Sequence, residues 1–301
     1  MREKFLIASL VIAAAMIKLF PGVSAQDAAA KAQQLINQAR AALGGDKLKS
    51  LQSLSATGNY RRSFGQMEMS GEVNYDLLLP DKMMKTEVMS PMPSLEITRI
   101  EALNGDDVWE DQQQHGGGGM VIIRRGSVGA NVDPRKAQAA LQQGVRSDFA
   151  RLLIGWILTT PSSFPVEYSF AGEAESPDGK ADVLDVKGAG GFAARLFLDQ
   201  KTHRPLMLTY NGRKPRVIMQ TMTGPPKHPE DAEKHAKEME AEAAKQPEVE
   251  YRIHLGDYRD VNGISFPHKL TRSIENEVNE ELEITKVKIN PQLKPEKFVK
   301  R

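Results

Sequence analysis

The sequence predicts a mainly β (α+β) protein in which a strongly curved antiparallel sheet, or open barrel, is combined with two helices. Three observations support this fold class. Stretches in which apolar and polar residues alternate recur along the chain, and residues 67–79 are a clear example. Asn262-Gly263 stands between two such stretches, a strong hairpin signal that favours antiparallel pairing. One long amphipathic segment with helical spacing interrupts the strands.

The first helix is expected at residues 27–43, a segment rich in alanine. Its apolar residues recur at helical spacing, namely Leu35, Ile36, Ala39 and Leu43. Gly44-Gly45 follows, and glycine is common directly after the last turn of a helix. These features predict an N-terminal helix that ends before residue 44.

From about residue 51 the hydrophobic period changes to two. Besides the 67–79 stretch, strands are expected at 82–90, 95–103, 164–172, 181–188, 192–199, 205–211, 215–222, 249–259, 264–275 and 280–289. Asp178-Gly179 marks a second turn. In the last strand the apolar positions change from even to odd numbers, which predicts a β-bulge near Thr285-Lys286. So many short antiparallel strands imply a curved sheet or an open barrel.

The second helix is expected to begin at Asp133-Pro134, an N-cap followed by proline at the first helical position. It ends near Thr160-Pro161, and its apolar stripe comprises Ala137, Leu141, Val145, Phe149, Leu152, Leu153, Trp156 and Ile157. Such a helix can cover an open sheet face. The polar, Ala/Glu/Lys-rich residues 224–248 predict an exposed helical excursion or a mobile loop.

Residues 1–25 have the pattern of a secretory signal peptide. A short charged start precedes the 13 apolar residues 5–17, and Val23 and Ala25 occupy the −3 and −1 positions of a cleavage site. Cleavage after Ala25 would leave residues 26–301 as one exported domain. The apolar run is shorter than the ~18 residues of a membrane span. An uncleaved N-terminal anchor is the alternative interpretation.

Composition excludes several functions. The chain has no cysteine, so it has no disulfide, thiolate nucleophile or cysteine metal site. Three of the 40 basic and one of the 39 acidic residues lie in the signal segment, which leaves 37 and 38. A nearly neutral chain without a basic block does not favour nucleic-acid binding, which needs clustered Lys and Arg against phosphates.

The sequence His115-Gly-Gly-Gly118 resembles the oxyanion-hole motif of lipases and esterases. That motif serves a nucleophile elbow, G-x-S-x-G, on a parallel sheet. The nearest pentapeptide, Arg125–Gly129, lacks the first glycine, and the predicted sheet is antiparallel. We therefore interpret the glycine cluster as a loop between a strand near Val108-Trp109 and residues 120–123.

Other catalytic and metal-binding patterns do not stand out. The glycine clusters fit neither phosphate-binding motif. The six histidines include no H-E-x-x-H, and the spacing of His228 and His235 in the acidic excursion suits no standard metal site. No pair of carboxylates can be singled out for glycoside hydrolysis. The sequence therefore predicts no catalytic residue, no metal and no cofactor.

Six methionines fall within 26 residues, at positions 67, 69, 83, 84, 89 and 92. Methionine adapts to irregular partners, so this segment suits either an apolar ligand cavity or ordinary core packing. The cavity candidates are Met67, Met69, Val73, Tyr75, Leu77 and Met84 on the strands, with Phe149, Leu153 and Trp156 on the second helix.

Three segments resemble the periplasmic LolA/LolB-like outer-membrane lipoprotein-carrier (lipoprotein-sorting) superfamily. Residues 42–63 contain a helix end at Gly-Gly followed by the Thr57-Gly58 step of a strand. Residues 194–210 contain a strand, an Asp199–Thr202 turn and Pro205. Residues 257–270 with 288–298 resemble a C-terminal pattern of the superfamily. The 224–248 excursion and the glycine-rich loop are additions to that pattern.

The resemblance implies a half-open antiparallel β-barrel with a helical lid, whose apolar interior holds the acyl chains of a lipid or lipoprotein without catalysis. Burial of each CH₂ is worth about 0.8 kcal/mol, so an acyl anchor needs shielding to cross water. The alternative is a structural or interaction module of a cell-envelope complex. It would have a filled core and would contact envelope proteins through an edge strand or the 224–248 excursion.

Overall fold

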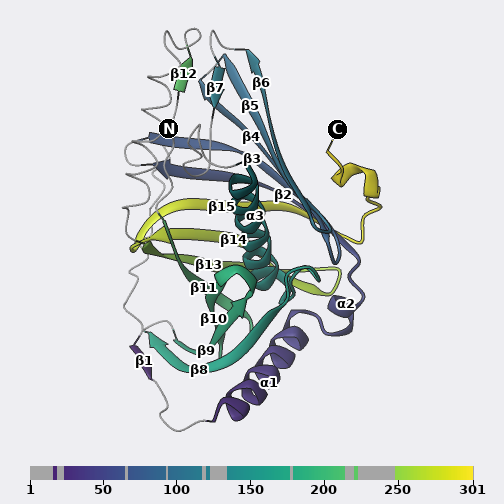
Figure 1. Cartoon of the computed structure of the whole chain (residues 1–301). Coiled ribbons are helices and arrows are strands. Elements are labelled where there is room, and N and C mark those ends of the chain that lie inside the picture. Colours follow the sequence, from purple (N-terminus) through teal and green to yellow (C-terminus); the bar gives the residue numbers. More distant parts are fainter. Residues whose placement is uncertain are drawn as a thin grey trace, which may run out of the picture.

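The computed structural model describes residues 16–18, 24–64, 67–92, 94–116, 120–122, 134–176, 179–213, 220–222 and 248–300. Its main feature is a curved antiparallel sheet with one long helix across the concave face (Figure 1). The predicted fold class, a mainly β half-open barrel with an N-terminal helix, is confirmed. Among the described residues, no helix has both the length and the apolar character needed to cross a membrane.

The main sheet contains 13 strands in the order β1-β8-β9-β10-β11-β13-β14-β15-β2-β3-β4-β5-β6. Their bounds are β1 (Met16–Lys18), β2 (Ser53–Phe64), β3 (Met67–Leu78), β4 (Lys82–Met92), β5 (Leu95–Asn104), β6 (Asp107–Gly116), β8 (Val166–Ser176), β9 (Gly179–Gly188), β10 (Ala193–Asp199), β11 (Pro205–Arg213), β13 (Glu248–Val261), β14 (Ile264–Ile274) and β15 (Glu277–Ile289). Two meanders, β2–β6 and β8–β15, are joined where β15 pairs with β2. The sheet does not close, because β6 and β1 lie at opposite ends of this order.

The Asn262-Gly263 turn and the β-bulge are confirmed, whereas Asp178 of the second predicted turn lies outside the described residues. Asn262 and Gly263 both have positive φ, 55° and 83°, as a two-residue type I′ hairpin between β13 and β14 requires. The pairing of β15 with β2 shifts register between Ile284 and Lys286, where the bulge was predicted. Because the shift turns the strand over, the apolar positions on both sides of the bulge still face the core.

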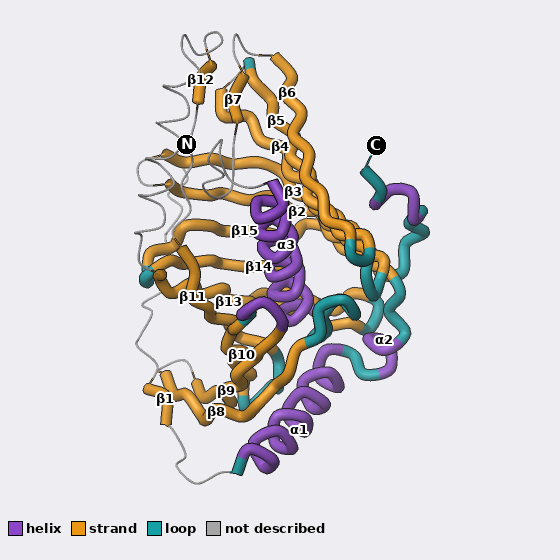
Figure 2. Tube along the Cα trace, viewed as in Figure 1, coloured by secondary structure: helices purple, strands orange, loops and turns teal. Residues whose placement is uncertain are grey.

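Three α-helices are described: α1 (Ala25–Leu43), α2 (Asp46–Lys49) and α3 (Pro134–Ile157). Helix α3 connects the two meanders and lies across the concave face, while α1 packs beside β8 (Figure 2). The C-terminal half of α3 buries two sides. Phe149, Leu153 and Trp156 enter the core on the concave face of the sheet. Ala150 and Ile154, together with Leu158 directly after the helix, pack in a second core with α1. This half is therefore an integral part of the fold.

The middle of α3 is fastened to both sides of the open sheet. The Arg146 guanidinium donates to the Asp106 carbonyl at 2.6 Å, beside the β6 edge. The Gln143 amide donates to the carbonyls of Ala189 and Gly190 at 3.2 and 3.3 Å, in the short helix η1 (Ala189–Gly191) between β9 and β10. The helix thus bridges the two meanders.

Several predicted segments lie partly outside the described residues. The expected strand at 215–222 is described at β12 (Gln220–Met222), which pairs with β7 (Met120–Ile122) in a separate two-stranded sheet. Residues 117–119 of the glycine cluster and 224–247 of the excursion are not described. In the predicted signal segment, β1 pairs with β8 at Glu173–Glu175, and Ser24 caps α1 through a 3.2 Å hydrogen bond from the Asp27 amide.

Candidate ligand pocket under helix α3

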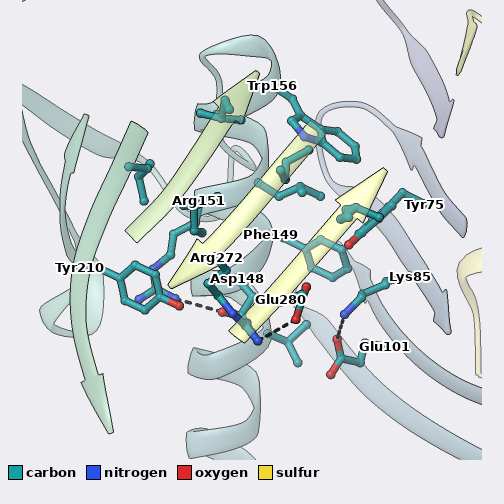
Figure 3. Close-up of a pocket in the computed structure, with 18 residues that line it drawn as sticks. Tyr75, Lys85, Glu101, Asp148, Phe149, Arg151, Trp156, Tyr210, Arg272 and Glu280 are labelled. Atoms are coloured by element: carbon teal, nitrogen blue, oxygen red, sulfur yellow. Dashed lines mark hydrogen bonds and ion pairs between the residues drawn. The ribbon is translucent and has the colours of Figure 1, made fainter. Parts of the chain in front are cut away.

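A pocket of about 110 Å³ lies between α3 and the concave face of the sheet (Figure 3). Its apolar lining comes from the helix residues Val145, Phe149, Leu152, Gly155 and Trp156 and from the strand residues Leu208, Ile253, Leu255, Leu270 and Leu282. Its polar lining comprises Tyr75, Lys85, Glu101, Asp148, Arg151, Tyr210, Arg272 and Glu280. The pocket is therefore amphipathic.

Strand register creates the apolar side of the pocket. Leu255 pairs with Leu270, and Leu270 pairs with Leu282, so three leucines stand side by side on β13, β14 and β15. Helix α3 approaches this row closely at Gly155, where an added Cβ would lie 3.2 Å from a Leu255 methyl carbon. The missing side chain thus allows α3 to pack against β13.

Trp156 forms the aromatic end of the pocket. Its ring makes edge-to-face contacts with Tyr75 and Phe266, at centroid distances of 5.1 and 4.9 Å. The whole side chain is buried, and its indole N–H has no hydrogen-bond partner among the described residues. Tyrosine and tryptophan in such pairs bury large apolar areas in a defined geometry. This end of the pocket is therefore fixed by packing.

The Arg151 side chain lies at another edge of the pocket. Its guanidinium stacks over the Tyr210 ring at 3.8 Å from the centroid, and its Nη1 contacts Asp148 at 3.0 Å. Tyr210 is itself stacked on Tyr251, with centroids 4.8 Å apart. Stacking of this kind holds the guanidinium in place between helix α3 and strand β11.

Eight charged side chains of alternating sign cross the concave face, and we call them the charged belt. From β6 to β14 they are Glu110, Arg99, Glu101, Lys85, Glu87, Arg62, Glu280 and Arg272. The successive N–O distances are 3.1, 2.9, 3.9, 2.6, 2.9, 2.6 and 2.7 Å. The four cations balance the four carboxylates, so the belt has no net charge.

The centre of the belt is buried. The side chains of Glu87 and Arg62 are 4% and 11% exposed. Burial opposes the charge of Glu280, but Arg272 and Arg62 beside it lower its pKa to about 2. Burial likewise opposes the charge of Glu87, yet Lys85 and Arg62 hold its pKa well below the usual value. Both carboxylates are ionised at neutral pH.

The belt crosses β3 without a charge from that strand. At this point β3 carries Gly71, and an added Cβ there would lie 2.9 Å from the Tyr60 hydroxyl. Arg62 lies over the Tyr60 ring, at 4.8 Å from its centroid, and reaches Glu87 on β4. The absence of a side chain at Gly71 therefore leaves room for Tyr60 beneath the Arg62–Glu87 pair.

The belt separates two apolar zones on the concave face. Along β4 and β5, same-face residues occur in the orders Met83, Lys85, Glu87, Met89 and Leu103, Glu101, Arg99, Ile97. On one side lies the main core, which contains the pocket. On the other side lies a small cluster, which we call the methionine cluster: Met69, Met89, Leu95 and Ile97.

The structure brings six of the nine predicted cavity residues into the main core: Val73, Tyr75, Leu77, Phe149, Leu153 and Trp156. Of these, Tyr75, Phe149 and Trp156 line the pocket. Met69 is in the methionine cluster, across the belt. Met84 is buried on the opposite face of the sheet, against Phe298 of the C-terminal helix η2 (Pro295–Phe298). The Met67 side chain lies outside the described residues.

The belt was not among the predicted sites, although the sequence contains a signal for it. On β4, Lys85 and Glu87 occupy positions in phase with Met83 and Met89, so they face the same side as buried residues. A charged pair in phase with apolar neighbours, repeated on adjacent strands, indicates buried ion pairs. Which charges meet depends on strand register, which the alternation does not provide.

Comparison with known proteins gives structural similarity alone. No protein-family model matches the chain, and no curated protein matches it. The structure is similar to that of a LolA superfamily protein from Nitrosomonas europaea, with 12% identity, a TM-score of 0.42 and coverage of 89% of this chain and 97% of that chain.

Two further solved structures are similar. One is a DUF1329 family protein from Desulfovibrio piger, with 9% identity, a TM-score of 0.46 and coverage of 89% and 97% of the two chains. The other is a putative outer membrane lipoprotein-sorting protein domain from Vibrio parahaemolyticus, with 10% identity, a TM-score of 0.45 and coverage of 90% and 97%. Similarity at this level concerns the fold, so ligands and partners are not transferred from it.

Proposed function

We propose that the protein is a periplasmic carrier that binds an acyl chain of a lipid or lipoprotein in the pocket under α3, without catalysis. The observation that carries this proposal is the apolar side of the pocket, where the row Leu255, Leu270 and Leu282 faces Phe149 and Trp156 of the helix. Each methylene moved from water to such a surface gains about 0.8 kcal/mol. A pocket of this kind shields an acyl chain without any covalent step.

Binding requires α3 to move. The pocket volume of about 110 Å³ is below the ~300–1,000 Å³ of typical small-molecule sites. The C-terminal half of α3 is anchored in two cores, whereas Gln138 and Gly144 in the N-terminal half are exposed. We therefore expect the N-terminal half of α3 to move away from the sheet by bending at Gly144, with release of the Gln138 and Gln143 hydrogen bonds, so that the pocket opens at its Val145 end.

The chain's two tryptophans provide a direct test. Trp156 lines the pocket, whereas Trp109 contacts Phe298 on the opposite face of the sheet, where its indole N–H donates to the Phe298 carbonyl at 2.9 Å. In a Trp109→Phe variant, brominated fatty acids should quench the fluorescence of Trp156 in a saturable manner. Heavy-atom quenching requires the chain to reach the indole, so it reports occupancy of this pocket.

The matched control is Trp156→Phe, which keeps Trp109 as the fluorophore. We expect little quenching in this variant, because Trp109 lies across the sheet from the pocket. Equal quenching of the two variants would show binding elsewhere. Absence of quenching in Trp109→Phe, together with intact folding by circular dichroism, would contradict the carrier function.

The small volume favours a second candidate function, a structural or interaction module of a cell-envelope complex. In that case the core is filled, and contacts are made by an edge strand or by the 224–248 excursion, most of which lies outside the described residues. The test compares proteins recovered from envelope extracts with wild type and with a 225–247 deletion. Identical recoveries would count against a role for the excursion.

A further inference from the structure

We propose that the charged belt limits the length of the acyl chain that the pocket accepts. This inference rests on the proposed carrier function and adds a determinant of specificity to it. Lys85, Glu101, Arg272 and Glu280 belong both to the belt and to the pocket lining. The belt is therefore the wall at which a chain lying along the concave face stops.

The position of the belt is the first reason for this inference. Same-face positions beyond it are apolar again, in the methionine cluster around Met69 and Met89. Without the belt, the concave face would offer one continuous apolar surface from the leucine row to Ile97. The charged residues divide that surface at one line, on β14, β15, β2, β4, β5 and β6, with Gly71 of β3 between the charges of β2 and β4.

The pairing within the belt is the second reason. Glu280 Oε2 contacts Arg62 at 2.6 Å and Arg272 at 2.7 Å, and Glu87 Oε1 contacts Lys85 at 2.6 Å. The charges are balanced, so the belt offers no net charge with which to attract a charged head group. A methylene inserted here would separate buried ions and would gain no apolar contact.

Stability does not account for the belt, which is the third reason. Replacement of a buried ion network by apolar residues of similar volume is often neutral or stabilising. An entirely apolar concave face would therefore fold as well. A row of charges across an otherwise apolar interior is explained by discrimination between ligands. Each methylene added against an apolar wall would raise the affinity, whereas a methylene added at the belt does not.

The test measures affinity across a series of saturated fatty acids from octanoate to stearate. Each competes with a brominated chain in the Trp109→Phe background, with Trp156 fluorescence as the readout. In the otherwise wild-type chain, affinity should rise about fourfold per methylene, up to a limiting length, and then level off. A rise that continues through the whole series would overturn the inference and leave the carrier function intact.

The belt variant combines Arg62→Met, Glu87→Leu, Arg272→Met and Glu280→Leu, which removes two charges of each sign. Lys85, Glu101, Arg99 and Glu110 remain as a balanced group. We expect the limiting length to move to longer chains. An unchanged limit in a folded belt variant would contradict the inference, as would a limit that moves equally in the control below.

The control variant changes exposed charges on neighbouring positions of the same sheet. Arg61 contacts Glu68 and Glu281 at 3.6 and 3.5 Å, and Lys269 contacts Glu281 at 3.9 Å. The control combines Arg61→Met, Glu68→Leu, Lys269→Met and Glu281→Leu, and it should keep the wild-type limit. If no chain quenches Trp156 in any protein, the carrier function itself fails, so the two failures are distinguishable. The pair Arg272→Met and Glu280→Leu is the smaller alternative if the belt variant does not fold.

Discussion

Arg62 and Glu280 form an ion pair of 2.6 Å inside the half-barrel, on strands β2 and β15. The two residues are direct partners in the strand register, at the place where the two meanders are joined. Arg62 also holds Glu87 at 2.9 Å, so one guanidinium connects β15, β2 and β4. The middle of the charged belt therefore coincides with the junction between the two halves of the fold.

Removal of a single charge from the belt should lower the free energy of unfolding more than the balanced removal of four charges in the belt variant. Arg62→Met leaves two buried carboxylates without this partner, and we expect it to lower the free energy of unfolding by about 3–5 kcal/mol. The exposed neighbour Arg61 is the control, and Arg61→Met should change that free energy by no more than ~0.5 kcal/mol. Urea unfolding followed by circular dichroism measures both. Equal effects would show that the ion pairs of Arg62 carry no special weight.

The belt also predicts an acid dependence of stability. The Glu280 pKa is about 2 in the folded protein, against an ordinary value of 4.5 in the unfolded chain, so the unfolded chain binds more protons between these values. The contribution of Glu280, up to about 3 kcal/mol, is therefore present above pH ~4.5 and is lost as pH falls through about 2. Glu87 acts in the same direction.

Urea unfolding at a series of pH values between about 5 and about 2 tests this acid dependence. The belt variant, which lacks Glu87 and Glu280, should lose part of the slope that the wild type shows. The same slope in both proteins would mean that other carboxylates govern the acid transition.

Substitution of two glycines by alanine should change the stability of the protein in opposite directions. At Gly71 an added methyl meets the Tyr60 hydroxyl and the Val88 carbonyl, so Gly71→Ala should destabilise the protein by about 1–3 kcal/mol. At Gly144 an added Cβ meets no atom within 4 Å, so Gly144→Ala should stabilise α3 by about 1 kcal/mol. Thermal unfolding of the two variants distinguishes these outcomes.

Gly144→Ala also tests the proposed opening of α3. If the helix bends at residue 144, this substitution should slow the association of brominated fatty acids in stopped-flow fluorescence, because alanine disfavours the bent form. The pocket lining is unchanged, so the final extent of Trp156 quenching should remain. An association rate equal to that of the wild type would place the opening elsewhere.

If the protein is exported as we propose, cleavage after Ala25 should give a mature chain that begins at Gln26. The cut removes Ser24, whose hydroxyl caps α1, and loss of such a cap costs about 1 kcal/mol. The first turn of α1 should therefore fray in the mature protein and show fast amide exchange. Intact mass of the protein recovered from the periplasm measures the cut, and a mass that retains residues 1–25 would contradict it.

Local patterns in the sequence were sufficient to predict most helices and strands of the fold. The period-two stretches predicted strands β3 to β5, β8 to β11 and β13 to β15 of the main sheet, and the change of phase after Ile284 located the bulge. Strand β1 lies in the segment predicted to be a signal peptide. These features depend on neighbours in the chain. The Arg62–Glu280 contact joins residues 218 positions apart, so neither periodicity nor composition could reveal it before the register was known.

The candidate site could be predicted only in part, because the sequence pattern does not provide the strand register. Met83 and Met84 are adjacent in sequence, and their side chains lie on opposite faces of β4, one in the main core and one against Phe298. A methionine-rich segment does not by itself show which face a residue takes. The positions of the aromatic residues of α3 were easier to predict, because helical spacing places Phe149 and Trp156 on the same side of the helix.

The most direct test of the carrier function is a native mass spectrum of the protein purified from the periplasm of an expression host. We predict an added mass of lipid size, which solvent extraction removes and which is absent in Leu152→Trp, where a larger side chain fills the pocket wall. A spectrum of the unliganded chain alone, with no uptake of added fatty acid by the wild type, would contradict the proposed function.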